Sequence, residues 1–206
     1  STRYLMIHLL GGVILFAGIA GHIAQTGSVA FTAMKLDDAS SGLILIGFLI
    51  NAAATPISAW LPDAYPEASW SGTVFLSAFT TKTAVYALIR GFPGTELLVW
   101  VGLAMAFYGI VYALLENDMR RLLAYSIVNQ GGFMIAGIGI GTELALNGAA
   151  AQAASGVIYV ALLLMSAGSV LRMTGRRKCS ELGGLFRSMP LTAFCATIAA
   201  LATSAF

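Results

Sequence analysis

The chain has 206 residues, of which 58% are hydrophobic and only 10% are charged, and its formal net charge at pH 7 is +2. Soluble domains carry about 25% charged residues, so the composition excludes an ordinary soluble protein and indicates an integral membrane protein. Its apolar runs are about 20 residues long, which predicts spanning helices instead of the short alternating strands of a membrane barrel. No basic run is interleaved with aromatic residues, so we expect no nucleic-acid partner.

Seven apolar segments predict an all-α fold, a polytopic transmembrane helical bundle that forms a single domain over residues 1–206. Pro56 lies inside the second segment and is expected to break its ladder of hydrogen bonds. Asn51, Thr55 and Ser58 lie close to this break, which makes it a suitable place for bound water; an ordinary kink is an equal alternative. The segments are near Tyr4–Ala24, Gly42–Leu61, Ser71–Arg90, Glu96–Leu115, Leu122–Gly141, Gly148–Leu171 and Pro190–Phe206.

The lysine and arginine residues of the connections are unequally divided between the two sides that alternating spans create. Lys35 and Arg90 fall on one side. The side with more basic residues is expected to be cytoplasmic. We therefore predict a multi-pass protein of a bacterial-type inner membrane, with its N-terminal end in the cytoplasm. The eight residues of the basic side are Arg3, Arg120, Arg121, Arg172, Arg176, Arg177, Lys178 and Arg187.

Lys82 is the most informative single residue, because the segment around it is otherwise free of charge until Arg90. An ammonium near the centre of a spanning helix costs roughly 3 kcal/mol on insertion scales. Such a residue usually faces a protein interior or a hydrated cavity and marks an ion or proton path. The alternative is a lysine that snorkels to the membrane surface, about 12–17 Å away along the helix.

Three runs of residues resemble the signatures of one membrane-protein family. They read WLPDAYPEA at Trp60–Ala68, NDMRRLLAYSIVNQGG at Asn117–Gly132 and LGGLFRSMPLTA at Leu182–Ala193. The chain resembles the antiporter-like, proton-conducting subunits of respiratory complex I and, most closely, the D-type protein of Mrp-type multisubunit cation/proton antiporters. The resemblance covers essentially the whole chain and implies the middle part of a longer subunit. An N-terminus without methionine and an end inside an apolar run agree with that expectation.

The resemblance implies that protons pass along ionisable residues, which are bridged by water at mid-membrane depth, as in that family. Lys82 matches a family lysine and would be the central titrating group. Asn51, Ser58, Thr81 and Gln130 would hold water around it. Six positions where the family often carries lysine or histidine are neutral here, and they are Asn51, Ser58, Gln130, Gln152, Gly156 and Val160.

Two histidines and two acids are further candidates for an ion path. His8 and His22 are fourteen residues apart and fall roughly on one helix face, where they could line a path or bond to a neighbouring helix. Asp63 and Glu67 lie in the predicted cytoplasmic loop, where they could gather cations at an entrance. The alternative is a solvated loop, or an ion pair to Arg120 or Arg121, which we expect to bind lipid phosphate.

The most concrete functional expectation is translocation of protons or monovalent cations within a multisubunit membrane complex. The chain contains no phosphate loop, zinc spacing or nucleophile triad, so we expect no cofactor, no metal and no covalent catalysis. Coupling would come from partner membrane subunits, and lipids would surround the chain. The alternative is a degenerate, non-pumping scaffold of a respiratory or photosynthetic complex. A third possibility is a lipid- or quinone-binding subunit that uses the cavity around Pro56.

Overall fold

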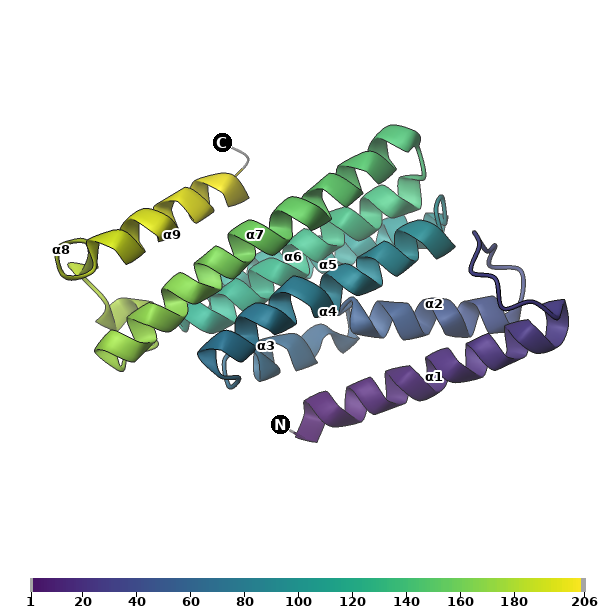
Figure 1. The fold of residues 1–206 in the computed structure, drawn as a ribbon, viewed down its shortest axis with the longest axis horizontal. Coiled ribbons are helices and arrows are strands. Elements are labelled where there is room, and N and C mark those ends of the chain that lie inside the picture. The colour runs from purple at the N-terminus through teal and green to yellow at the C-terminus, as the bar shows by residue number, and fades with distance from the viewer. Residues whose placement is uncertain (1, 205–206) are drawn as a thin grey trace.

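The computed structural model describes residues 2–204, and nearly all of this stretch is helical (Figure 1). Its described part contains no strand beyond an isolated bridge between Asp118 and Lys178, so the predicted all-α fold is confirmed. Short 3-10 turns occur at Ile57–Ala59 and Cys179–Glu181. The helices are α1 (Thr2–Thr26), α2 (Ala39–Asn51), α3 (Trp60–Ala64), α4 (Trp70–Gly91), α5 (Glu96–Leu115), α6 (Met119–Ile140), α7 (Glu143–Thr174), α8 (Leu185–Ser188) and α9 (Pro190–Thr203).

Five helices of the described chain, α1 and α4 to α7, are long and apolar enough to cross a membrane. The apolar helices α2 and α9 are shorter, and together these seven correspond to the seven predicted segments. Helix α5 has the bounds predicted for the fourth segment. Helix α7 extends beyond the bounds predicted for the sixth segment at both ends. Thr142 accepts a hydrogen bond from the Ala145 amide at 3.3 Å, and Gly175 ends the helix in the left-handed conformation. Phe206, where the last segment is predicted to end, lies outside the described residues.

Neighbouring helices run antiparallel to each other, roughly along the long axis of the molecule (Figure 1). Helix α5 lies against α6, α4 against α7, and α1 against α2, while α9 covers part of α7. The α5–α6 contact is especially close, because glycines leave no side chain between the backbones. A Cβ atom on Gly132 would lie 2.6 Å from the Ala106 amide nitrogen, and one on Gly109 would lie 2.5 Å from that of Asn129.

Ion pairs and hydrogen bonds join the connections at one end of the bundle. Arg3 pairs with Asp63 at 2.6 Å, and Arg177 pairs with Glu67 at 2.9 Å. Since these residues come from the N-terminal turn, the α3–α4 region and the loop after α7, the segments predicted to share the basic side do lie together. We call this end the basic end. Arg172 stacks over the Trp70 ring there, 4.5 Å from its centroid.

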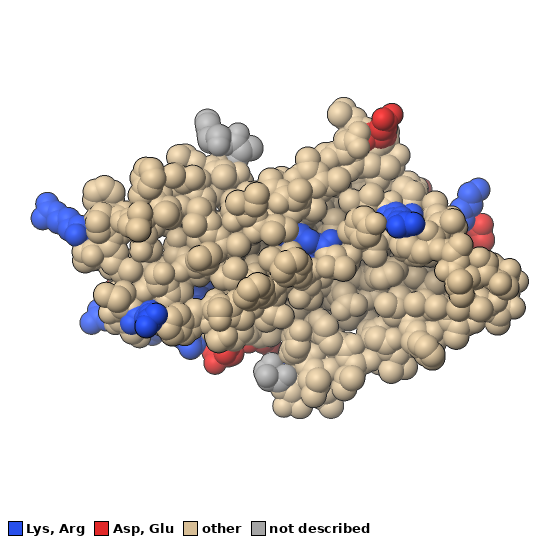
Figure 2. Space-filling model, viewed as in Figure 1, with Lys and Arg blue, Asp and Glu red and all other residues tan. Residues whose placement is uncertain are grey.

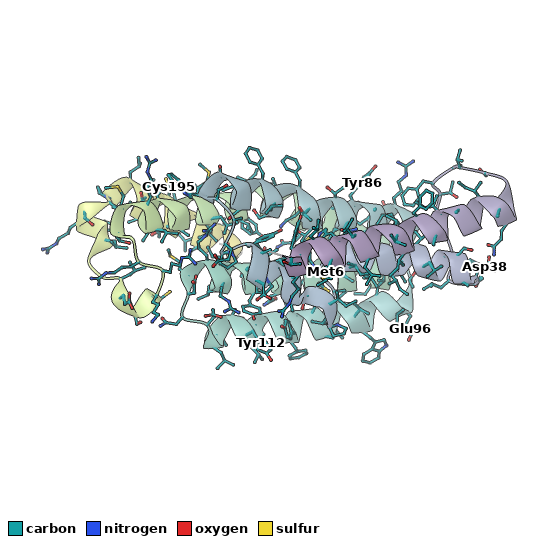
Figure 3. All side chains as sticks on the ribbon, turned by 90° about the horizontal axis from the view of Figure 1, so that it is seen from below. Met6, Asp38, Tyr86, Glu96, Tyr112 and Cys195 are labelled. Atoms are coloured by element: carbon teal, nitrogen blue, oxygen red, sulfur yellow. The ribbon has the colours of Figure 1, made fainter. Side chains whose placement is uncertain are left out.

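The remaining connections meet at the opposite end. The Met34 amide donates to the Gly91 carbonyl at 2.7 Å, and the Gly94 amide donates to the Ile138 carbonyl at 2.9 Å. Figure 3 shows Asp38 and Glu96 toward this end. In Figure 2, most of the visible face is uncharged, and most charged side chains lie toward the ends of the long axis. This arrangement is typical of a bundle whose long axis crosses a bilayer.

Candidate functional site

The second predicted segment is broken in the middle, as Pro56 predicts. Helix α2 ends at Asn51, and regular helix resumes only at Trp60, after a short 3-10 turn. Ala53 is fully buried in the break with a left-handed backbone, φ +59°, which is unfavourable for a residue with a side chain. The Trp60 indole nitrogen donates to the Ile50 carbonyl at 3.2 Å and so ties the two halves together.

Hydroxyl oxygens without a partner in the described part of the chain lie in the break and on α4. The side-chain oxygens of Thr55, Ser58 and Thr81 have no hydrogen-bond partner among the described residues. Asn51 donates to the Gly47 carbonyl of its own helix at 3.2 Å. Buried polar groups are normally paired, and ordered water is the usual partner where protein offers none.

The cavity next to the break is small and mostly apolar. Its volume is about 140 Å³, and its lining includes Thr55, Ile57 and Val101. Ligand pockets typically measure about 300–1,000 Å³. The cavity therefore gives no support to quinone or lipid binding around Pro56.

Lys82 lies inside the bundle on α4 and faces α7. Only 8% of the residue is exposed, which argues against snorkelling to the surface. Its Cε atom lies 3.8 Å from the position that a Cβ atom on Gly156 would occupy. None of the five ion pairs among the described residues includes Lys82. The ammonium is therefore buried without a carboxylate from this part of the chain.

A polar network from α6 and α7 lies beside Lys82. The Gln152 amide nitrogen donates to the Tyr159 hydroxyl at 2.7 Å, and that hydroxyl donates to the Gln130 side-chain oxygen at 3.2 Å. The Tyr159 hydroxyl also lies 3.5 Å from the Cβ position of Gly156, the same point that Lys82 approaches. We call Lys82, Gln130, Gln152, Gly156 and Tyr159 the Lys82 cluster.

Sequence reasoning anticipates part of this cluster. Lys82 and Gln130 are predicted site residues, and Gln152 and Gly156 are matched family positions. Tyr159 is not among them, although its spacing of seven residues from Gln152 places both on one face of a helix. Val160, the sixth matched position, is buried in the apolar core.

The break and the cluster adjoin the same stretch of α6. Gly131, which follows Gln130, would place a Cβ atom 4.0 Å from the Ala52 carbonyl oxygen in the break. Helix α6 thus has Gly131 beside the break and Gln130 in contact with α7. The predicted site residues Asn51 and Ser58 at the break and Gln130 in the cluster therefore lie in adjoining parts of the bundle, and Thr81 precedes Lys82 on α4.

The two candidate entrance acids are engaged in ion pairs at the basic end. Asp63 belongs to α3, not to a loop as predicted, and its carboxylate lies 2.6 Å from Arg3 and 4.0 Å from Arg121. Glu67 pairs with Arg177, not with Arg120 or Arg121. Both acids are at least partly exposed, so each ion pair is expected to be weak, about 0–1 kcal/mol.

Arg120 has a role that the sequence does not indicate. It is only 3% exposed, and its guanidinium donates to the carbonyls of Pro66 at 2.8 Å and Ala68 at 3.0 Å and to the Thr73 hydroxyl. Its donors are turned into the protein, so the expectation that Arg120 binds lipid phosphate is wrong. It fastens the connection between α3 and α4 instead.

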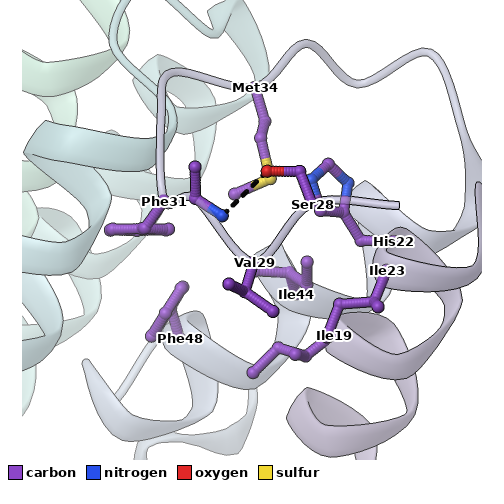
Figure 4. A pocket seen from close by; sticks show the side chains of 10 residues that line it. Ile19, His22, Ile23, Ser28, Val29, Phe31, Met34, Ile44 and Phe48 are labelled. Carbon is purple, nitrogen blue, oxygen red and sulfur yellow. Dashed lines mark hydrogen bonds between the residues drawn. The ribbon is translucent and has the colours of Figure 1, made fainter. Parts of the chain in front are cut away.

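The histidines lie near opposite ends of α1, His8 against α3 and His22 beside α2. The His8 ring packs edge-on against Trp60 at 4.5 Å, and its Nδ1 is 3.1 Å from the Tyr4 carbonyl. His22 lines a cavity of about 350 Å³ together with Ser28 and Met34 of the α1–α2 connection (Figure 4). That the two histidines share one helix face stays a prediction, and neither belongs to the Lys82 cluster.

Residues 2–204 contain no group of three or more His, Cys, Asp or Glu side chains that could hold a metal ion. The two cysteines are free: Cys179 is exposed, and Cys195 lies in α9. The side chains of the break and of the Lys82 cluster provide an amine, a phenol hydroxyl, amides and aliphatic hydroxyls.

Comparisons with known proteins agree with the motifs. The sequence model of the family described as "NADH:quinone oxidoreductase/Mrp antiporter, TM" matches residues 1–206. The chain is 29% identical to the D-type protein of the Na(+)/H(+) antiporter of Alkalihalophilus pseudofirmus, over 98% of this chain and 45% of that protein. It is 30% identical to the M-type protein of the NADH-quinone oxidoreductase of Pseudomonas aeruginosa, over 92% of this chain and 42% of that protein.

A solved structure shows the same fold. A polypeptide in the structure of the Mrp complex from a Dietzia species superposes with a TM-score of 0.91 and 27% sequence identity, over 98% of this chain and 41% of that one. The chain thus spans less than half the length of the relatives it matches. It belongs to the NADH:quinone oxidoreductase/Mrp antiporter family of multi-pass membrane proteins.

Proposed function

We propose that this chain is part of an antiporter-like subunit that translocates protons or monovalent cations across a membrane, within a multisubunit complex. The family match supports this, as do relatives named as parts of an Na(+)/H(+) antiporter and of an NADH-quinone oxidoreductase. The partners are other membrane subunits and the surrounding lipids. The excess of basic residues at one end favours a bacterial-type inner membrane with that end, and the N-terminus, in the cytoplasm.

The environment of Lys82 is the strongest support for this function. An amine buried among helices without a carboxylate of the described chain beside it is costly, and such residues are retained in membranes mainly for ion or proton movement. The polar neighbours of Lys82 are neutral, so they do not hold the ammonium permanently in its charged form. Lys82 is the central titrating group of the proposed path.

The rest of the path consists of polar groups that can hold water. Asn51 and Ser58 provide them at the helix break, Thr81 provides one next to Lys82 on α4, and Gln130 provides them beside Lys82. Two of these groups, the hydroxyls of Ser58 and Thr81, have no partner among residues 2–204. His8, His22 and the acids Asp63 and Glu67 are proposed to contribute only near the ends of the molecule, since each is engaged or exposed there.

The test is proton and sodium flux in proteoliposomes that contain the complete assembly. Lys82→Ala is expected to abolish flux while the complex still assembles. Lys35→Ala is the matched control, because Lys35 is an exposed lysine in the α1–α2 connection, and it is expected to leave flux unchanged. Unchanged flux in Lys82→Ala, or no flux in the native assembly, would reject transport through this chain and leave the non-pumping scaffold.

A further inference from the structure

Gly156 creates a small opening between α4 and α7. Because glycine has no side chain, the Cε atom of Lys82 and the hydroxyl of Tyr159 both reach the space where a Cβ atom would be, at 3.8 Å and 3.5 Å. Lys82 approaches this opening from α4, whereas Tyr159 returns to it from one turn further along α7. The opening therefore brings one cationic and one neutral polar side chain together in a buried interface.

The Tyr159 hydroxyl is held in place from two directions. It donates its proton to the Gln130 side-chain oxygen at 3.2 Å and accepts a hydrogen bond from the Gln152 amide nitrogen at 2.7 Å. A hydroxyl group has one donor hydrogen and two acceptor lone pairs. With the hydrogen and one lone pair engaged, one lone pair remains for a further donor.

We propose that Tyr159 is a positioning residue for Lys82: the two side chains face each other across Gly156, and the ammonium uses the Tyr159 hydroxyl as a fixed neutral acceptor through bridging water, since no direct hydrogen bond joins the two groups in this structure. This inference rests on the proposed role of Lys82. A carboxylate in the same place would favour the charged form of the amine strongly. A phenol hydroxyl orients the ammonium and compensates part of its lost hydration, yet it leaves the proton free to move on.

The contact can be tested without measuring transport. Solid-state NMR of the complete assembly in lipid, with ¹⁵N-lysine in this polypeptide, reports the Nζ signal of Lys82, which is assigned by its loss in Lys82→Gln. Tyr159→Phe is expected to shift this signal. Tyr86→Phe is the control, because Tyr86 is on the same helix as Lys82 but 60% exposed, and it should leave the signal in place. An unshifted signal in Tyr159→Phe would overturn the proposal.

Flux measurements test whether the hydroxyl itself is needed. Tyr159→Phe is expected to lower flux about tenfold, as loss of one hydrogen bond to a charged group predicts. Adding Gly156→Ser places a new hydroxyl at the opening and should restore most of the flux, whereas adding Gly156→Ala supplies only a methyl group and should not. Equal rescue by both, or rescue by neither, contradicts a positioning role.

The two experiments separate the two proposals. If the native assembly carries no flux, the proposed function fails, and the NMR shift alone decides whether Tyr159 faces Lys82. If flux is present and depends on Lys82 but the Lys82 NMR signal is unchanged in Tyr159→Phe, the proposed transport function is supported and the positioning role of Tyr159 is rejected.

Discussion

Arg120 is the residue whose replacement should most clearly expose how the basic end is built. We consider Arg120→Met, which keeps most of the length of the side chain and removes all its donors. The substitution withdraws hydrogen bonds from the Pro66 and Ala68 carbonyls and from the Thr73 hydroxyl. Because these acceptors lie in the connection between α3 and α4, the damage should concentrate where the broken helix joins the lysine-bearing helix.

The expected cost follows from the number of acceptors left unpaired. A buried polar group without a partner costs about 1–3 kcal/mol. The contact of Arg120 with Pro66 is buried, whereas that with Ala68 is only partly buried, so water can replace some of the second bond. Removing a buried cation also recovers part of its desolvation cost. The net loss in free energy of unfolding should be about 2–4 kcal/mol.

The neighbouring Arg121 provides a matched control. Its side chain is 41% exposed and pairs with Glu116 at 3.4 Å and with Asp63 at 4.0 Å. Exposed ion pairs contribute about 0–1 kcal/mol, so Arg121→Met should have a small effect. Thermal unfolding in lipid nanodiscs, followed by circular dichroism, should show a midpoint lowered by roughly 5–15 °C for Arg120→Met and by less than about 4 °C for Arg121→Met. Equal shifts for the two variants would contradict the assigned role of Arg120.

Two further pairs of substitutions test the packing with the same unfolding assay. Gly132→Ala should destabilise by about 1–3 kcal/mol, because the new methyl group would lie 2.6 Å from the Ala106 amide nitrogen, whereas Gly148→Ala meets nothing within 4 Å and should be neutral or slightly stabilising. Similar midpoints for both would argue against close α5–α6 contact. Ala53→Gly should change the free energy of unfolding by less than about 1 kcal/mol, because relief of the left-handed backbone offsets the lost methyl group. Ala54→Gly, at a buried position without that strain, should lower it by about 1–2 kcal/mol. If Ala53→Gly is the costlier of the two, the left-handed conformation is not strained.

The helix break shows which structural features a local sequence pattern can predict. Proline inside an apolar segment is enough to predict the interruption, because a residue without an amide hydrogen cannot continue the ladder. The chain conformation within the break is not predictable, since the left-handed Ala53 carries none of the glycine signal that such a backbone usually requires. Contacts such as the Trp60 hydrogen bond to Ile50 accompany it, and they depend on how the two halves pack.

The arginine pair shows the opposite case, in which identical residues have different surroundings. Arg120 and Arg121 are adjacent and both have the appearance of basic residues at a membrane surface. Their side chains leave α6 about 100° apart, so one enters the protein and the other faces its exterior. Only the rotation of the helix about its axis decides which of the two is buried. Because a membrane helix is apolar on every side, its sequence gives little indication of that rotation.

Segment length, composition and motifs are local properties of the chain, and they are sufficient to identify a multi-pass helical membrane protein of the NADH:quinone oxidoreductase/Mrp antiporter family. They also suffice to place Lys82 within a candidate membrane-spanning helix and to predict that the basic connections share one end of the bundle. The meeting of Tyr159 with Gln130 and Gln152 beside Lys82, by contrast, emerges only from the folded bundle. A hydrogen bond between helices requires their rotation and axial register, and these are set by the packing of the whole bundle, not by the residues that form the bond.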